Sequence, residues 1–542
     1  MSVPVSDDAF HVYDTTLRDG AQREGLSFSV ADKLAVARHL DDLGVGFVEG
    51  GWPGANPKDV EFFRRARTEL NLSHATLAAF GATRRPGAKA ADDPQVAALR
   101  ESGAPVVTLV AKAHVGHVTR ALRTTAEENL AMIGDTVAHL RAAGRRVFLD
   151  AEHFFDGYAL DPAYAVEVLL VAAEAGADVV VLCDTNGGTL PAQLADVVGT
   201  VAATGLRIGI HAHDDTACAV ANSLAAVQAG ATHVQGTANG YGERCGNADL
   251  FSVVAGLELK LGRQVLPEGR LAELGRVSHA VAELANIAPD PHQPYVGSSA
   301  FAHKAGLHVS AVKVAPELYQ HMDPAAVGND MRLLVSELAG RATVELKSRD
   351  LGLQTDREAA GRVVERVKEL EARGWAFEAA EASFELLLRT ETDGVRPSYF
   401  DVESWRVIVE TRADGTVVSE ATVKLHAKGE RIVATGEGNG PVNALDTALR
   451  VGLERTYPDL ARLDLVDYKV RIVEGEHGTA AVTRVLVETS DGESQWDTIG
   501  VHENVVAASW DALVDAVTYG LLRRESADAA RNPDLPAGDA PV

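Results

Sequence analysis

One phrase recurs through the first half of the sequence: a helix-like segment ends at glycine, and a short run of β-branched residues follows. The phrase is seen in LDDLGVGFVEG (40–50), ESGAPVVTLV (101–110), AEAGADVVVLCD (173–184) and VAATGLRIGIHAH (201–213). Glycine supplies the left-handed backbone conformation that ends a helix. Apolar strand runs without polar alternation are typical of parallel strands that are covered on both faces. The pattern therefore predicts repeated strand–helix units.

Counting these units gives about eight strands between residues 10 and 260, with helices in the gaps. We expect strands near 11–17, 46–50, 76–80, 105–110, 146–152, 178–184, 207–213 and 232–236. Ser29, with Asp32 three residues on, is predicted to cap the first helix. Eight such units in about 250 residues is the size of a (β/α)8 TIM barrel. A doubly wound open sheet is the competing interpretation.

Polar residues gather where the predicted strands end. They are Arg18, Asp19, Glu49, Glu152, Asp184, Thr185, Asn186, His211, His213 and the residues 236–239. In a TIM barrel the carboxyl ends of all strands meet at one mouth, where active sites are built, whereas an open sheet would scatter several of them. Their positions favour the barrel.

The sequence HAHDD predicts a metal site. His211 and His213 are two residues apart on a strand, so both imidazoles point to one face. Asp19, at the end of the first strand, is the predicted oxygen ligand, and Asn247 is a candidate for a fourth ligand. Two imidazoles and two oxygens suit Mg²⁺, Mn²⁺, Co²⁺ or Zn²⁺, and the residues do not choose among them. A pair of hydrogen-bonded structural histidines is the alternative.

Three further residues are candidates for the reaction itself. Arg18 can polarise a carbonyl and stabilise an enolate oxygen, or else form a structural salt bridge at the barrel rim. Glu152 is either an acid that faces the ligand or a residue that orients another group. Thr185 can bond a substrate carboxylate, or else cap the helix that begins near Pro191.

The motifs DTTLRDGAQ (14–22), HAHDDTACAVANSLAAVQAG (211–230) and GYGERCGNADL (240–250) strongly resemble those of the 2-isopropylmalate, homocitrate and citramalate synthases. These enzymes belong to a TIM-barrel metallolyase-like superfamily. The phrases EGGWPGANPKD (49–59) and DAEHFFDGY (150–158) resemble the longer type of citramalate synthase in particular. The resemblance spans nearly the whole chain.

The resemblance implies a Claisen condensation of acetyl-CoA with pyruvate, followed by thioester hydrolysis to (R)-citramalate and CoA, in isoleucine biosynthesis. It implies that the metal chelates the 2-oxo acid and that Thr185 and Gln22 help to bind the substrate. The segment SSAFAHKAGLH (298–308) resembles one that reaches over the barrel mouth, often from the partner subunit of a homodimer. By that similarity His308 is an acid/base candidate and Tyr319 a lesser one.

The domain organisation follows from the change of pattern along the chain. We expect the catalytic barrel at 1–262, a helical linker region at 263–394, a C-terminal α+β regulatory domain at 395–525 and a disordered tail at 526–542. The regulatory segment has strand patterns and two helices in roughly two copies of a ββα unit. By resemblance to the family it senses an amino acid, for which we expect isoleucine.

Composition limits the partners and the compartment. The 51 basic and 77 acidic side chains give a net charge of −26, which repels nucleic acid and anionic membranes. Three cysteines in 542 residues suit a reducing cytosol. The N-terminus lacks the pattern of a signal peptide, and no membrane span is expected. We therefore expect a cytoplasmic enzyme.

Rival functions differ in substrate or in class. 2-Isopropylmalate synthase performs the same chemistry on a branched 2-oxo acid. A hydroxyacyl-CoA lyase resembles the barrel half but needs no regulatory domain, and a biotin-dependent carboxyltransferase would need a Met-Lys-Met site that the four methionines do not form. A non-catalytic amino-acid sensor would not need the Arg18, Asp19, His211 and His213 set.

Overall fold

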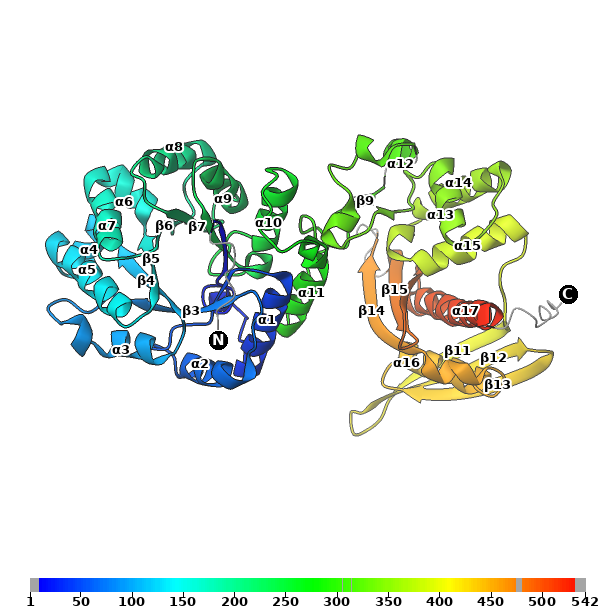
Figure 1. Ribbon diagram of the computed structural model, residues 1–542. Helices are drawn as coiled ribbons and strands as arrows, with labels where there is room; N and C mark the ends of the chain where they lie inside the picture. Colours follow the sequence, from blue (N-terminus) through cyan, green and yellow to red (C-terminus); the bar gives the residue numbers. More distant parts are fainter. Residues whose placement is uncertain (1–8, 305, 313, 474–479, 532–542) are drawn as a thin grey trace. The chain divides into compact units, whose positions relative to one another are not determined.

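A computed structural model describes residues 9–304, 306–312, 314–473 and 480–531 (Figure 1). The chain divides into two compact units. The first comprises Met1–Phe301 with Met322–Met331, and the second comprises Ala302–His321 with Arg332–Val542. Each unit has hydrophobic cores of its own.

Eight parallel strands close into a barrel in the first unit, in chain order. They are β1 (His11–Asp14), β2 (Phe47–Glu49), β3 (Thr76–Ala82), β4 (Val106–Lys112), β5 (Arg146–Glu152), β6 (Val179–Asp184), β7 (Ile208–Ala212) and β8 (His233–Gly236). The barrel closes where β8 pairs with β1, with Val234 opposite Val12. The predicted TIM barrel is confirmed. The doubly wound alternative is wrong, because an open sheet has no pairing between its two edge strands.

Helices that follow the strands form the outer layer of the barrel. They are α1 (Val30–Leu43), α2 (Pro57–Glu69), α3 (Pro94–Glu101), α5 (Ala126–Ala142), α7 (Pro162–Glu174), α8 (Pro191–Ala202), α9 (Ala219–Gln228) and α10 (Leu250–Leu259). The predicted cap of α1 is confirmed: the Asp32 amide donates to the Ser29 hydroxyl at 3.2 Å, and the Ser29 amide donates to the Asp32 carboxylate at 2.8 Å. The short helices α4 (Val115–Arg120) and α6 (Phe154–Leu160) were not predicted, because six or seven residues carry little periodicity.

Alternate side chains of the strands fill the barrel interior. Tyr13, Phe47, Ala78, Val106, Phe148, Val179, Val181 and Cys183 pack together there. Their neighbours Val12, Val180 and Ile210 pack outward against the helices. Because side chains alternate along a strand, Asp150 and Glu152 on β5 and His211 on β7 face the interior. The alternation of side chains along each strand thus directs the polar side chains at the strand ends into one mouth of the barrel.

The predicted linker region is divided between the two units. In the first unit, α11 (Leu274–Leu284) packs on α1, beside the short turns η4 (Arg270–Glu273) and η6 (Pro324–Val327). The second unit holds β9 (Ala302–His303), α12 (Gly306–Val312), η5 (Pro316–Leu318), β10 (Arg332–Leu333), α13 (Arg341–Asp350), α14 (Arg357–Glu371), η7 (Phe377–Ala379) and α15 (Glu381–Asp393). Strand β9 pairs with β10, so the two points at which the chain enters this unit, at Ala302 and at Arg332, lie side by side.

The C-terminal part repeats one motif twice. The first copy is β11 (Asp401–Thr411), β12 (Val417–Ala427), β13 (Glu430–Gly438) and α16 (Pro441–Leu453); the second is β14 (Asp464–Ile472), β15 (Thr483–Ser490), β16 (Gln495–His502) and α17 (Val505–Arg531). The motif is therefore βββα rather than the expected ββα. The difference in the first copy arises at Lys428–Gly429, both with positive φ, where the strand-patterned stretch 419–438 turns into a hairpin.

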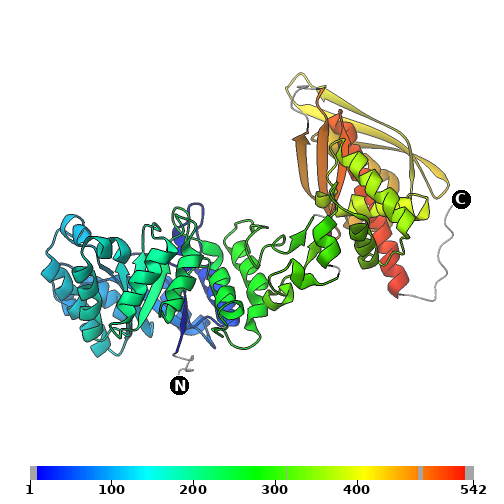
Figure 2. The same cartoon turned by 90° about the horizontal axis from the view of Figure 1, so that it is seen from above.

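A glycine in the third strand of each copy lets the helix approach the sheet. A Cβ atom on Gly436 would lie 2.4 Å from the backbone nitrogen of Ala448 in α16. A Cβ on Gly500 would lie 1.9 Å from the carbonyl oxygen of Ala508 in α17. Figure 2 shows α17, in red, against the orange strands β15 and β16. Each sheet thus buries one face under its own helix.

Helix α17 is long and apolar enough, by length and composition alone, to cross a membrane. However, 61% of its apolar window is buried inside the protein, and its own residues Ala508, Ala512 and Leu513 pack in a hydrophobic core. We interpret α17 as a core helix. It continues to Arg531, six residues into the segment that was expected to be a disordered tail, and the rest of that segment lies outside the described residues.

Candidate metal centre

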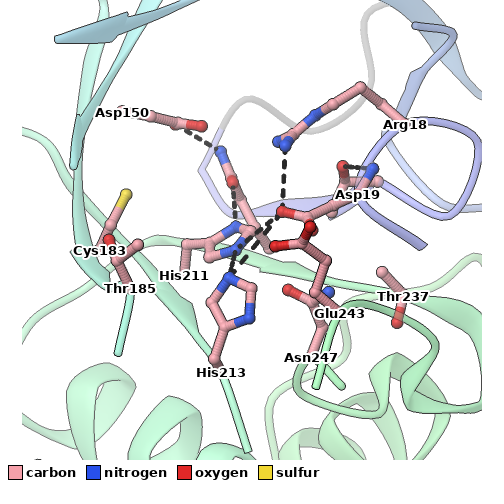
Figure 3. A network of polar contacts seen from close by, with 12 residues as sticks. Arg18, Asp19, Asp150, Cys183, Thr185, His211, His213, Thr237, Glu243 and Asn247 are labelled. Atoms are coloured by element: carbon pink, nitrogen blue, oxygen red, sulfur yellow. Dashed lines mark hydrogen bonds and ion pairs between the residues drawn. The ribbon is translucent and has the colours of Figure 1, made fainter. Parts of the chain in front are cut away.

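Two histidines and one aspartate converge at the mouth of the barrel (Figure 3). His211 lies in β7, His213 follows that strand, and Asp19 precedes the short turn η1 (Gly20–Gln22) after β1. Asp19 Oδ2 lies 3.4 Å from His211 Nε2 and 4.0 Å from His213 Nε2. The two Nε2 atoms are 3.3 Å apart. The barrel thus brings Asp19 together with two histidines that lie almost 200 positions further along the sequence.

This donor set fits a divalent cation. The ligand atoms of Asp19, His211 and His213 all lie within 4.8 Å of one another, and all three residues are buried. The amide nitrogen of Asn247 donates to the Tyr241 carbonyl at 3.0 Å, but its Oδ1 atom is buried and has no hydrogen-bond partner within the described chain. A buried acceptor without a donor is costly. A cation bound by the two imidazoles and the carboxylate would supply the missing partner.

Buried charge around the centre also favours a cation. The Asp19, Glu49 and Asp150 carboxyl groups are all buried at this end of the barrel interior, and Arg18 is the cation that lies among them. Burial, followed by the Glu49 charge, raises the pKa of Asp150 to about 7. Burial makes the charged forms of these carboxyl groups costly, and a bound cation would offset that cost.

The pKa values of the three residues suit ligands at neutral pH. Burial alone would raise the pKa of Asp19, but Arg18 and His211 beside it hold that pKa below its ordinary value. Burial, and then the neighbouring His211, lowers the pKa of His213 to about 4, so this ring is neutral. Burial alone would lower the pKa of His211, but Asp19 raises it above the ordinary value. A proton therefore competes with the cation mainly at His211.

Arg18 is held beside the centre by two carboxylates and a ring. Its Nε donates to Glu49 Oε2 at 2.6 Å and its Nη1 to Asp19 Oδ2 at 3.0 Å. The guanidinium carbon lies 3.8 Å from the centroid of the Phe80 ring. The salt bridge at the rim is present and holds the guanidinium beside Asp19, whereas the role of Arg18 toward a carbonyl or enolate oxygen stays a prediction.

Glu152 faces the mouth and forms an ion pair with Lys112 on the neighbouring strand. Thr185 follows β6, and its hydroxyl accepts a hydrogen bond from the His153 backbone amide at 2.8 Å. A hydroxyl that accepts can still donate its own hydrogen to a ligand. The Thr185 carbonyl accepts from Arg244 at 2.8 Å, and Arg244 also binds Asp215. The loop that carries Asn247 is therefore tied to Thr185.

The other predicted substrate and acid/base residues belong to other segments of the chain. Gln22 is exposed in the turn η1, where its backbone amide donates to the Asp19 carbonyl at 3.0 Å. His308 and Tyr319 belong to the second unit, where their rings stack at 4.3 Å and both side chains are exposed. Their roles at the barrel stay predictions.

Some residues of the centre received no role from the sequence. Glu49 is fully buried and accepts from Tyr13 at 2.6 Å and Thr15 at 2.5 Å as well as from Arg18. Gln235 lies on β8. Its amide oxygen is hydrogen-bonded to His211, and its amide nitrogen donates to Asp150. Strand alternation could have indicated that both face the interior, but their partners come from other strands and are not readable in sequence.

A cavity of about 370 Å³ opens beside the centre in the first unit. Its wall includes Asn247, Tyr241 and the exposed Cys245 on one side and the segment 287–290 on the other. The cavity is large enough for a small molecule to approach the proposed ligand Asn247. The site therefore combines a cation centre, a fixed arginine and access from solvent.

Comparison with known families assigns most of the chain. Residues 9–281 match the family described as HMGL-like, residues 295–374 match the domain described as homocitrate synthase post-HMGL domain-like, and residues 378–521 match the LeuA allosteric (dimerisation) domain. The first match covers the barrel and the whole centre described above.

Relatives match over nearly their whole length. The chain is 69% identical to the (R)-citramalate synthase of Streptomyces coelicolor over 96% of this chain and 98% of that protein. It is 49% identical to the (R)-citramalate synthase of Aquifex aeolicus, over 95% and 98%. It is 50% identical to that of Synechocystis, over 94% and 96%. A probable 2-isopropylmalate synthase of Methanopyrus kandleri is 32% identical, over 95% and 99%.

Proposed function

The chain belongs to the (R)-citramalate synthase family of HMGL-like acyltransferases, and from that premise we propose that its barrel condenses acetyl-CoA with pyruvate. Hydrolysis of the thioester then gives (R)-citramalate and CoA. The observation that carries the proposal is the convergence of Asp19, His211 and His213 at the barrel mouth of a chain so similar to these synthases. We favour pyruvate over a branched 2-oxo acid because five (R)-citramalate synthases are 43–69% identical to this chain. The probable 2-isopropylmalate synthase and a putative (R)-citramalate synthase of Methanopyrus kandleri are 32% and 31% identical.

Asp19, His211, His213 and Asn247 would hold the divalent metal. When bound, such an ion acts as a Lewis acid toward the oxygens of the 2-oxo acid. The residues fit Mg²⁺, Mn²⁺, Co²⁺ or Zn²⁺. Thr185, whose hydroxyl can donate, is assigned to the substrate carboxylate, with Gln22 at the rim as a second candidate. We assign Arg18 to the oxygen that becomes negative as the carbon–carbon bond forms.

A base must take a proton from the methyl carbon of the acetyl group, so that this carbon can bond to the keto carbon of pyruvate. We assign that role to His308, supported by Tyr319 stacked on it, and we assign Glu152 to ordering the reacting groups. Glu152 is suited to this because its ion pair with Lys112 fixes the carboxylate. Water then breaks the thioester, and the thiol of CoA leaves with a proton.

The test is CoA release measured with a thiol reagent. Acetyl-CoA is offered with pyruvate, 2-oxobutyrate, 2-oxoisovalerate or 2-oxoglutarate, with and without a chelator. We expect release to be fastest with pyruvate and to stop with the chelator. Preference for 2-oxoisovalerate would keep the chemistry but change the substrate. Absence of release from folded, metal-loaded protein would overturn the proposal.

We propose that isoleucine regulates the enzyme through the second unit, in a homodimer. A cavity of about 730 Å³ lies between the start of α16 and β14, lined by Val442, Leu465 and Tyr468 together with Asp446 and Arg450. The N-terminus of a helix favours the carboxylate of an amino acid, and apolar lining side chains favour its branched aliphatic side chain. Inhibition by leucine but not isoleucine would overturn the choice of effector, and a monomer by light scattering would overturn the dimer.

We place the reaction in the cytoplasm. Cys183, Cys218 and Cys245 are all free thiols, as expected in a reducing compartment. Localisation of a tagged full-length chain tests this.

A further inference from the structure

Gln235 lies between a candidate metal ligand and a buried acid. His211 and Gln235 are opposite each other on the neighbouring strands β7 and β8, and His211 Nδ1 is 2.8 Å from Gln235 Oε1. The Gln235 amide nitrogen donates to Asp150 Oδ1 at 2.9 Å, on β5. Figure 3 draws the resulting line of contacts from Asp150 to His211. All three residues are at most 4% exposed.

The orientation of the Gln235 amide places the hydrogens in this line. Its nitrogen donates to Asp150 Oδ1, and the ionised form of Asp150, which only accepts hydrogen bonds, holds the amide in this orientation. The amide oxygen must then face His211. Because that oxygen only accepts, His211 Nδ1 must carry the hydrogen, and the lone pair of the neutral ring is left on Nε2. Nε2 is the atom that faces Asp19 and His213.

We propose that Gln235, oriented by Asp150, is a positioning residue that sets the tautomer and direction of His211 for metal binding. This inference rests on the metal centre of the proposed function. Partners of this kind behind a ligand imidazole typically change metal affinity by about 10–100-fold when removed.

A purely structural role explains the arrangement less well. The backbone pairing of β7 and β8 already fixes the position of Gln235 without its side chain. Burying the Asp150 carboxyl is costly, and an apolar pair at these two positions would fill the same space without that cost. The polar line is therefore better explained by what it does to His211 than by what it does for the barrel.

The test uses the full chain stripped of metal and titrated with Zn²⁺ or Mn²⁺ alone against a chromophoric chelator. Gln235→Leu removes both hydrogen bonds at similar volume, and Gln235→Met is the alternative if the first variant does not fold. The matched control is Asn222→Leu, which removes a buried amide of α9 that donates to the Thr189 carbonyl outside the barrel interior. Asp150→Asn keeps an acceptor but lets the Gln235 amide turn over.

We expect Gln235→Leu to weaken metal binding by about 10–100-fold, Asp150→Asn to weaken it less, and Asn222→Leu to bind like the wild type. Turnover of Gln235→Leu should recover as the metal concentration is raised. An affinity within threefold of wild type, or an equal loss in Asn222→Leu, would overturn the role of Gln235. A wild-type chain that binds neither ion would overturn the metal centre itself, which is a different result.

Discussion

Glu49 is the residue whose replacement best tests how the centre is held. Its carboxylate is fully buried and accepts hydrogen bonds from the Arg18 guanidinium at 2.6 Å, the Tyr13 hydroxyl at 2.6 Å and the Thr15 hydroxyl at 2.5 Å. Glu49→Gln keeps the shape of the side chain. It removes the charge and turns one acceptor oxygen into a donor that faces other donors.

The expected cost follows from the contacts. No cavity forms, so the loss comes from the hydrogen bonds and from the uncompensated charge on Arg18. Breaking a buried ion pair by removing one partner costs about 3–5 kcal/mol. The substituted amide keeps one acceptor oxygen, so one or two of the three hydrogen bonds are lost, at about 1.5–3 kcal/mol each, a range that overlaps the first. Because Asp19 also binds Arg18, we expect the lower end of this range, about 3 kcal/mol.

Hydrogen exchange in peptides that cover β1 and β2 of the full-length chain measures this loss for the barrel without mixing in the second unit. A loss of about 3 kcal/mol raises the opening equilibrium of globally protected amides by roughly a hundredfold. Glu61→Gln is the control, because Glu61 forms an exposed ion pair with Arg64 and its loss should not change exchange. Equal exchange in Glu49→Gln and Glu61→Gln would refute the reasoning.

Three more predictions concern pH and substrate. Metal affinity should fall between pH 8 and pH 6, because Asp19 raises the pKa of His211 and a protonated ring cannot bind the metal. Below that pKa the fall should reach up to about tenfold per pH unit. Competitive titration at the two pH values checks this, and a flat profile contradicts it. Burial raises the pKa of Asp14 from 3.8 to about 7, so its neutral form is favoured by folding and the metal-free protein should lose stability as pH rises from about 4 to about 7. Thermal unfolding of Asp14→Asn should show a shallower fall over that range, and an unchanged slope would be the contrary result. Thr185→Val should lower kcat/KM for pyruvate by roughly 10–100-fold, because one hydrogen bond to a charged group contributes about 1.5–3 kcal/mol. In steady-state assays most of this change should be a higher KM. An unaltered KM would remove Thr185 from the carboxylate site.

Much of the barrel could be predicted because its signals are local. A glycine after most of the helices and an apolar run after that glycine define a unit, and the Ser29 cap of α1 is a contact between residues three apart. The helices α4 and α6 were missed because each is shorter than two turns. The third strand of each C-terminal motif was missed because a tight turn such as Lys428–Gly429 divides a stretch that has strand patterning on both sides of the turn.

The sequence by itself determined the class of this protein: eight strand–helix units, a pair of histidines on one strand face, and motifs shared with a family of synthases. Only the tertiary structure decided which groups support those residues. Glu49 under Arg18, Lys112 beside Glu152, and Asp150 behind Gln235 and His211 are all partnerships between different strands. Local order along the chain sets the period of a strand, but the closure of the barrel sets which side chains meet inside it, and burial there sets their charge.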